Sequence, residues 1–357
     1  MTDLNTTLDD WADGAAAALV LEQPLRPVVG TLVFPPTFAP VKRGDASDYV
    51  LDEIDGRGVV TLDTPGAQAN RLEPLFMADP LSALVPQITI KAGNEQKNLL
   101  ELGHRAADAL ARSTDANARI REAFEQVLVG DHSALAAFAP TSLVFGAWDS
   151  RDTGAKLPRL LESRIDAYGV EKRHRSAQYF AALNFVEAGL LDSSTNKKEL
   201  DQRSQAGFRD SPSGRQAGGV EIVDGGRIVR MVTIHLVAIN RLRAGTDKVR
   251  SADLRGYIMG LALAAATSPS PLPLFLRQGC SLVPLEPPAW RAVGFDGAEQ
   301  TVALPYDAVL AYTVSARDRL FGGRWKSTET WTATKAGAQV EVKKRAKGDD
   351  DVGATAL

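Results

Sequence analysis

The chain of 357 residues contains a single cysteine, Cys280, and four histidines. One thiol cannot form an internal disulfide or a cysteine-rich zinc site, so the composition favours a reducing compartment. The histidines are widely spaced and none forms the HExxH pair that binds catalytic zinc. These shortages exclude a disulfide framework and argue against the common zinc enzymes.

Long apolar runs and a basic leader are also missing. The best apolar run, from Tyr257 to Ala266, is shorter than the roughly 20 residues that a membrane-spanning helix needs. The N-terminal sequence MTDLNTTLDDWADG is acidic, whereas a signal peptide begins with basic residues. We therefore expect a soluble cytoplasmic protein that does not contact a membrane.

Catalytic signatures are absent as well. The segment from Gly146 to Lys156 does not match the phosphate loop GxxxxGK[ST], because Leu157 follows the lysine, and no GxSxG elbow occurs. Asp149 and Asp152 are candidate metal ligands, but neighbouring basic residues favour a role in organising the turn. The sequence predicts a protein that is not an enzyme and has no cofactor.

Charge is distributed unevenly along the chain. The net charge is −3, yet residues 151–256 hold 19 Lys and Arg against 13 Asp and Glu. A basic middle within an acidic frame is compatible with a local phosphate-binding face and with partner surfaces of the opposite sign.

The densest basic segment runs from Phe145 to Tyr179. Guanidinium and ammonium groups at this density, beside flexible backbone at Gly146 and Gly154, suit an extended polyphosphate better than a single reacting bond. Its basic side chains are Arg151, Lys156, Arg159, Arg164, Lys172, Arg173 and Arg175.

Apolar spacing and turn residues give a coarse secondary structure. Thr64 or Asp63 should cap a helix that begins with Pro65. Further helices are expected at 94–112, around 120–128, at 157–168, 252–266 and 305–320. Strands are expected at 27–34, 58–62, 84–90, 143–148, 179–186 and 280–284, with a long element at 227–242 and edge strands within 325–342. This β-α-β…β-α-β order predicts an α+β protein with a ferredoxin-like fold, the topology of RNA-recognition modules.

A long polar insertion interrupts the order between residues 192 and 219. It has almost no apolar residues, and the stretch Asp224-Gly225-Gly226 after it is a hairpin signal. Such an insertion is either a disordered loop or an arm that orders on a partner, and both interpretations stay open. An anionic partner is favoured by Lys197, Lys198, Arg203, Arg209 and Arg215, with Phe208 available to stack on a base.

Several blocks together resemble a known family. They are Phe34-Pro-Pro-Thr-Phe38, Gln68-Ala-Asn-Arg-Leu-Glu73, His104-Arg-Ala-Ala-Asp108 and Phe145-Gly-Ala-Trp-Asp-Ser150 with Lys156 and Arg159. Their order and spacing, over about residues 25–245, are similar to those of the repeat-associated (RAMP) backbone subunit of type I-G CRISPR effector complexes, formerly called type I-U. The chain departs from the family near Ala67, where hydroxyl residues are common.

The resemblance implies an RRM-like palm, a helical finger region at 92–138 and a thumb β-hairpin at 192–227. The RRM-like domain would span 25–342, between an N-terminal segment at 1–24 and a disordered tail at 343–357. Such subunits are non-catalytic, polymerise head to tail along a CRISPR RNA and present it for pairing with target DNA. The implied partners are CRISPR RNA, target DNA, further copies of this chain and other subunits of the Cascade complex.

The hypothesis assigns RNA contacts to basic and polar side chains, because backbone phosphates and 2′-hydroxyl groups bind such groups without sequence preference. They are Gln68, Asn70, Arg71, Lys156, Arg159, Arg164, Lys172, Arg173, Arg175, Ser176 and Gln178, together with Lys197, Lys198, Arg203, Phe208, Arg209 and Arg215 in the arm. The alternatives are a metal-dependent nuclease that uses Asp149 and Asp152, and a filament-forming assembly protein without RNA.

Overall fold

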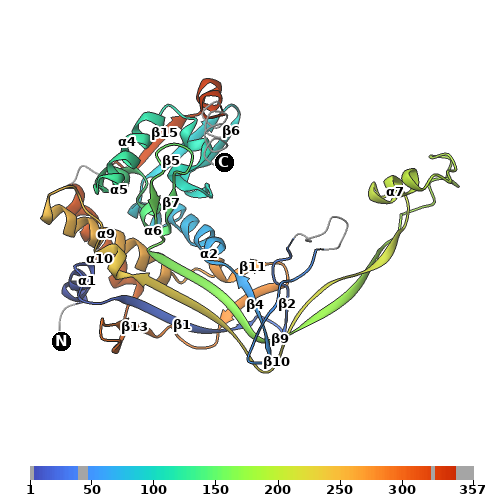
Figure 1. Cartoon of the computed structure of the whole chain (residues 1–357), viewed down its shortest axis with the longest axis horizontal. Coiled ribbons are helices and arrows are strands. Elements are labelled where there is room, and N and C mark those ends of the chain that lie inside the picture. Colours follow the sequence, from blue (N-terminus) through green and yellow to red (C-terminus); the bar gives the residue numbers. More distant parts are fainter. Residues whose placement is uncertain (1–3, 39–46, 323–325, 343–357) are drawn as a thin grey trace, which may run out of the picture.

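A large antiparallel sheet runs through the molecule, and two of its strands continue beyond it as a long arm (Figure 1). The computed structural model describes residues 4–38, 47–322 and 326–342. Helices pack against the large sheet, and a small second sheet lies at the opposite side of these helices (Figure 1). The protein is therefore of the mixed α and β class, as the sequence predicts.

The large sheet has the strand order β11-β12-β1-β10-β9-β4-β3, with β2, β13 and β14 paired to its members. Neighbouring strands along this order are antiparallel. The bounds are β1 Ala18–Pro27, β2 Leu32–Val33, β3 Asp52–Ile54, β4 Arg57–Asp63, β9 Leu161–Tyr179, β10 Ser211–His235, β11 Phe275–Arg277, β12 Cys280–Pro284, β13 Trp290–Val293 and β14 Glu299–Val302.

The centre of this sheet is built from alternating side chains. Leu19 and Leu21 of β1 are buried opposite Ile234 and Val232 of β10, whereas Glu22 is exposed. Successive side chains of a strand point to opposite faces, so the apolar set lies on the face that the helices cover.

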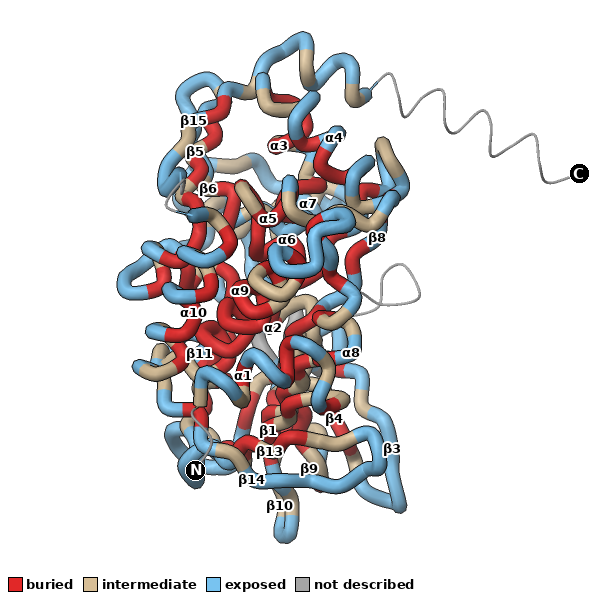
Figure 2. The backbone as a smooth tube through the Cα atoms, turned by 90° about the vertical axis from the view of Figure 1, so that its left-hand side faces the viewer, coloured by how far each residue is buried: buried red, intermediate tan, exposed pale blue. Residues whose placement is uncertain are grey.

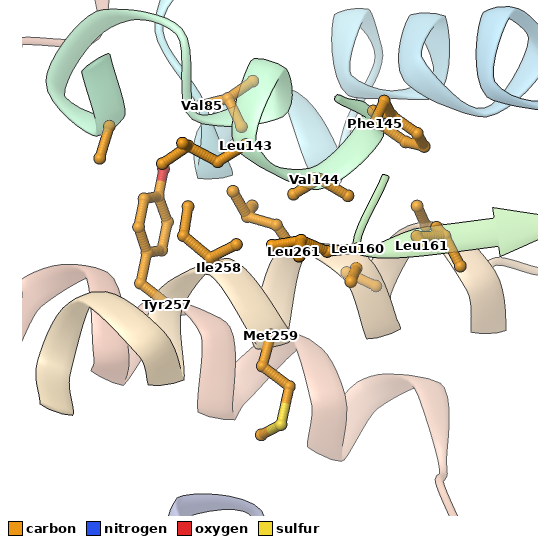
Figure 3. Close-up of a cluster of buried hydrophobic side chains, with 14 of the residues drawn as sticks. Val85, Leu143, Val144, Phe145, Leu160, Leu161, Tyr257, Ile258, Met259 and Leu261 are labelled. Atoms are coloured by element: carbon orange, nitrogen blue, oxygen red, sulfur yellow. The ribbon is translucent and has the colours of Figure 1, made fainter. Parts of the chain in front are cut away.

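The main helical layer surrounds α9, which is buried along most of its length (Figure 2). Ile258 and Leu261 of α9 lie beneath Leu143 and Val144 (Figure 3). The Tyr257 hydroxyl donates to the carbonyl oxygen of Leu84 over 2.8 Å, so the polar tip of this buried ring is satisfied. The helices of the layer are α1 Leu4–Ala12, α8 Leu236–Ile239, α9 Lys248–Thr267 and α10 Tyr306–Phe321.

The small sheet has the order β15-β5-β6 and joins distant parts of the chain. β15 pairs parallel to β5, and β5 forms a hairpin with β6. The strands are β5 Gln87–Ala92, β6 Glu95–Asn98 and β15 Thr328–Thr332. α2 Pro65–Leu72 packs against β9 of the large sheet, and α6 Pro140–Phe145 packs against α9. The remaining elements of this part of the chain are α3 Ala109–Arg112, α4 Asn117–Leu128 and α5 Ser133–Phe138, with short 3-10 turns at Glu73–Met77, Leu81–Leu84, Leu99–Glu101 and Arg105–Ala107. A further 3-10 turn, η5, spans Leu272–Leu274.

Several predicted elements are confirmed. β4 contains the strand expected at 58–62, and Thr64 caps α2 with Pro65 as its first residue. β12 has the bounds of the strand expected at 280–284. α4, α9 and α10 also lie where amphipathic or apolar spacing predicts them. The strand predicted at 27–34 is largely wrong, because β1 ends at Pro27, residues 28–31 form a bend and only Leu32–Val33 pair, as β2. The predicted tail at 343–357 lies outside the described residues.

The helix predicted at 94–112 is wrong. Gly93, with a φ of +61°, turns the chain between β5 and β6. The Asn98 side chain then accepts from the backbone N–H of Leu100 over 3.0 Å and starts a short 3-10 turn. A turn residue and an early cap divide the apolar residues among short elements.

The helix predicted at 157–168 is also wrong, and so is the strand at 143–148, the first half of which belongs to α6. Leu161, Ser163, Ile165 and Ala167 are buried, whereas Arg164 between them is exposed, which is the period of a strand. The same leucines also fit a helical period. Pairing of β9 with β10 and β4 decides between the two periods.

The hairpin signal at Asp224-Gly225-Gly226 marks a bulge, not a turn. Tyr168 lies opposite Arg227 while Val170 lies opposite Ile222, so residues 223–226 bulge out against Gly169. Gly169 has a φ of +66°, and a Cβ there would lie 2.8 Å from Cα of Gly226. The bulge lies where the arm leaves the sheet (Figure 1).

The connection between the two arm strands is residues 180–210, which include α7 Lys197–Gln205. The strand predicted at 179–186 is therefore wrong, because β9 ends at Tyr179 and the chain continues in turns. We call residues 180–210 the arm tip.

Candidate nucleic-acid interface

The hairpin of β7 Ala147–Trp148 and β8 Lys156–Leu157 presents the first predicted phosphate-binding side chain. Lys156 is exposed, and its Nζ lies 5.4 Å from the centre of the Trp148 ring. This cation–π contact holds the ammonium group against an aromatic surface without neutralising it.

The loop of this hairpin is organised by Asp149. Its Oδ2 accepts from the backbone N–H and the hydroxyl of Thr153, over 2.9 and 2.7 Å. Asp152 instead lies 3.7 Å from the Arg121 guanidinium. Within the described residues, no group of three or more His, Cys, Asp and Glu could hold a metal ion.

Arg159 lies beside the N-terminal turn of α2. One of its terminal nitrogens is 3.6 Å from the position that a Cβ on Gly66 would take. Thr64 caps this turn by accepting from the backbone N–H of Ala67 over 3.2 Å. A helix N-terminus already carries a partial positive charge, so an exposed guanidinium beside it creates a local field that attracts anions.

The predicted residues on α2 itself are mostly occupied within the protein. Gln68 is fully buried and bonds Asp63, Ser163 and the carbonyl oxygen of Pro273. Arg71 pairs with Asp63 at 2.9 Å and donates to the backbone of β11. Contrary to the prediction, Gln68 is not on the surface, and Arg71 serves to fix α2 to the sheet.

Arg164 lies on the open face of β9, where Asp166 pairs with it at 3.2 Å. Asp166 is buried and also accepts from the Thr61 hydroxyl over 2.8 Å, whereas the Arg164 side chain is 47% exposed. The guanidinium is therefore paired within the protein on one side and open to solvent on the other.

The outer half of β9 carries the basic residues of the arm. Lys172 hydrogen-bonds Asp48 and lowers the pKa of that carboxyl, and Arg173 lies 3.6 Å from Glu221. Arg175 lines a cavity of about 440 Å³ together with Phe34 and Tyr49. Two further predicted residues of this half, Ser176 and Gln178, are exposed.

The arm tip holds the remaining predicted residues. Lys197 and Lys198 are exposed on α7, while Arg203 pairs with Glu199 and donates to the carbonyl oxygen of Asp192 over 2.7 Å. The Arg203 side chain is thus a brace within the tip rather than a free cation. Arg209 lines a cavity of about 610 Å³, and Arg215 belongs to β10 but its side chain lies outside the described residues.

Phe208 packs edge to face on Phe185, with ring centres 4.9 Å apart. The Phe208 side chain is 45% exposed, so part of the ring contacts Phe185 and part of it faces solvent.

The structure therefore distributes the predicted residues over distinct places: the β7–β8 hairpin with the α2 N-terminus, the outer half of β9, and the arm tip, which Figure 1 shows far from the body. Two further candidates were not predicted. Trp148 is 59% exposed beside Lys156 and lies in the block Phe145–Ser150. The Arg57 guanidinium lies 3.6 Å from the position of a Cβ on Gly225 at the bulge. An exposed aromatic next to a basic residue was the available signal for Trp148.

Among the described helices, none has the length and the apolar character needed to cross a bilayer. In comparisons with known proteins, residues 19–172 match the model of a family described as CRISPR-associated protein GSU0053. No curated protein matches the chain. The matched segment contains α2, the β7–β8 hairpin and most of β9, and it indicates a CRISPR-associated protein family.

Proposed function

We propose that this protein is a non-catalytic RNA-binding backbone subunit of a type I-G CRISPR effector complex. Copies assemble head to tail along the guide RNA, bind its phosphates through the β7–β8 hairpin and the arm, and leave its bases free to pair with target DNA. Contacts with other Cascade subunits at the filament ends complete the complex.

The observation that carries this proposal is the position of Arg159 beside the N-terminus of α2, next to the exposed Lys156. Within the protein, the Arg159 guanidinium and the partial positive charge of the α2 N-terminus repel each other. A bound phosphate would remove this repulsion, since it accepts hydrogen bonds both from a guanidinium and from backbone N–H groups.

The sheet supports the palm of this proposal. β12, β1, β10 and β9 lie side by side in that order, and α2 and α9 are inserted before β9 and after β10 in the sequence. This arrangement is the one expected of a ferredoxin-like βαββαβ unit, on which RNA-recognition modules are built.

The arm supports the thumb. Lys172, Arg173 and Arg175 lie on the outer half of β9, one of the two strands that project from the sheet (Figure 1). Basic side chains spaced along an extended strand can follow a polyphosphate backbone, as proteins that bind single strands do.

The proposal is tested by comparing the RNA affinity of the wild type with that of a variant that lacks Lys156 and Arg159. The wild type should bind single-stranded RNA of arbitrary sequence at low salt. Lys156→Ala with Arg159→Ala should weaken binding by about 10- to 100-fold and reduce the slope of log affinity against log salt by about 1.5, because two phosphate contacts are lost.

The matched control is Arg241→Ala with Lys248→Ala, which removes the same charges from exposed positions near the start of α9. This variant should bind like the wild type, apart from the small effect of net charge. Absence of RNA binding by the wild type, or equal losses in both double variants, would refute the proposed interface.

A second candidate, an assembly protein without RNA, is favoured by the apolar surface of the arm tip, where Phe180 is 66% and Leu190 is 64% exposed. Purification from cells that express a CRISPR array distinguishes the two. Assemblies that hold a uniform RNA and fall apart on nuclease treatment support the first function, whereas assemblies that ignore nuclease support the second.

A further inference from the structure

Arg105 is a buried arginine in an uncommon backbone conformation. It is 5% exposed and has a φ of +56°, in the left-handed region that residues with a side chain rarely adopt. Holding such a residue in this conformation strains the backbone, so its contacts must compensate for the strain.

The guanidinium of Arg105 joins two parts of the candidate site. Its Nε lies 2.7 Å from Oε2 of Glu73, and one terminal nitrogen donates to Oδ1 of Asn70 over 3.4 Å. The other terminal nitrogen donates to the carbonyl oxygen of Gly146 over 3.2 Å, and the group lies 5.5 Å from the centre of the Phe145 ring. One side chain thus ties the end of α2 to the corner from which the β7–β8 hairpin begins.

The Gly146 corner in turn touches the backbone that carries Arg159. A Cβ on Gly146, which has a φ of +79°, would lie 3.0 Å from the carbonyl oxygen of Leu157 and 3.1 Å from the backbone nitrogen of Arg159. Any shift of this corner is therefore passed directly to Arg159, because packed backbone has no room to absorb it.

The pair of Arg105 and Glu73 is expensive to bury. Burial raises the pKa of Glu73 to about 7, against the Arg105 guanidinium and the Thr141 hydroxyl, which lower it. Burial likewise lowers the pKa of Arg105, and the nearby Arg159 acts in the same direction. An apolar pair of similar size would cost less, so stability alone does not explain a charged pair here.

We propose that Arg105 is a positioning residue for the phosphate-binding site at Arg159, acting through its simultaneous hold on α2 and on the Gly146 corner. It brings together the blocks Gln68–Glu73, His104–Asp108 and Phe145–Arg159, which the sequence places far apart. This inference rests on the proposed RNA binding, and it concerns how the site is held rather than what it holds.

A double-mutant cycle with Arg159→Ala tests whether Arg105 acts through Arg159. Arg105→Lys keeps the charge but loses the fork that reaches Asn70 and Gly146 together. In the wild-type background it should weaken RNA binding about tenfold, as expected when one charge-assisted contact is misplaced. In the Arg159→Ala background it should add less than about twofold, because the contact that it positions is already gone.

Arg112→Lys is the matched control. Arg112 is also a buried arginine paired with a glutamate, Glu341, and it donates to the backbone of Ala107. Its replacement should lower the melting temperature to a similar extent but leave RNA affinity within about twofold of the wild type. A general loss of stability would affect both variants alike.

A milder variant, at an exposed position, tests the same role if Arg105→Lys does not fold. Asn70 is exposed, and Asn70→Ala removes one acceptor of Arg105. It should weaken binding about threefold, and that loss should disappear in the Arg159→Ala background.

The outcomes separate the two proposals. A wild type that does not bind RNA overturns the proposed function and this inference with it. A wild type that binds, with Arg159→Ala weakened but Arg105→Lys and Asn70→Ala either unchanged or strictly additive to it, overturns the positioning role alone.

Discussion

The body and the arm tip of this protein are held together by different forces. In the body, α9 is buried from Tyr257 to Ala266 and packs against α6 and α10 (Figure 3). In the arm tip, residues 180–210, no described side chain is buried. The body therefore folds around its own apolar core, whereas the tip has no core of its own.

Local polar bonds define the tip instead. The Tyr179 hydroxyl donates to the carbonyl oxygen of Gly207 over 3.1 Å, and the backbone N–H of Ala181 donates to Asp210 over 2.8 Å. Each such bond contributes about 1 kcal/mol or less when it is open to water. The tip can therefore open locally without cost to the body, and a partner surface would stabilise it.

The largest effect should come from removing one leucine from the core. Leu261→Ala, at a fully buried position of α9, should lower the free energy of unfolding by about 2–5 kcal/mol because it leaves a cavity. The same change in the tip, Leu200→Ala on α7, should cost less than about 1 kcal/mol. Urea unfolding measures both, and similar losses would contradict the division between body and tip.

Glu73 should make the body sensitive to pH. Its pKa is about 7 when folded against an ordinary value of 4.5, so between these values the folded state binds more protons than the unfolded state. The free energy of unfolding should therefore fall as pH rises from about 4.5 to about 7, by up to about 3 kcal/mol, and then level off.

Urea unfolding at pH 5.5 and 7.5 measures this fall, which Glu73→Gln should abolish. The control in the tip is Glu199→Gln. Hydrogen bonds from Ser194 and Arg203 lower the pKa of Glu199, so it stays ionised over this range and its replacement should leave the slope unchanged. A slope that persists in Glu73→Gln would assign the titration to another group.

Replacing a glycine of positive φ by alanine should destabilise the protein more at the bulge than in the arm tip. Gly169→Ala should lower the free energy of unfolding by about 1–3 kcal/mol, because the new Cβ would meet the backbone of Gly226 at 2.8 Å. Gly189, in the tip, has a φ of +70° and nothing within 4 Å of an added Cβ. Gly189→Ala should change global unfolding by less than about 0.5 kcal/mol, since the tip relieves the strain by opening. Equal melting temperatures for the two variants would remove the distinction.

The smallest effect should follow from Phe208→Ala in the tip. The change removes the contact with Phe185 and should alter the free energy of global unfolding by less than about 0.5 kcal/mol. Limited proteolysis should nevertheless cut residues 180–210 several times faster, and a protected tip would show that it is more strongly held than its exposure indicates.

The sequence predicts elements whose signals are local. The Thr64 cap with Pro65, the apolar run of α9 and the alternating residues of β12 need no distant partner, and each is confirmed. Residues 161–168 fit both a helical and a strand period, and only pairing with β10 and β4 resolves them. Asp224-Gly225-Gly226 has turn chemistry, but Gly169 across the strand pair makes it a bulge.

The candidate site follows the same division. Exposure of Lys156 and Arg159 agrees with their place in a basic, glycine-rich segment. The burial of Gln68 could not be predicted, because its partner Ser163 belongs to a strand that the sequence reads as helix. The role of Arg105 depends on Glu73 and Gly146, which are far from it in sequence, so spacing alone gives no sign of it.

The parallel pairing of β15 with β5 has a consequence for synthesis of the chain. Trp331 lies beside Ile90 in the sheet, its ring packs 5.7 Å from that of Phe138, and Glu329 pairs with Arg119 at 2.8 Å. While the ribosome has not yet released this stretch, one edge of β5 and the Phe138 ring face water. Completion of the small sheet therefore waits until residues 328–332 have left the ribosome, and a chain truncated before β15 would present an unpaired strand edge to chaperones and proteases.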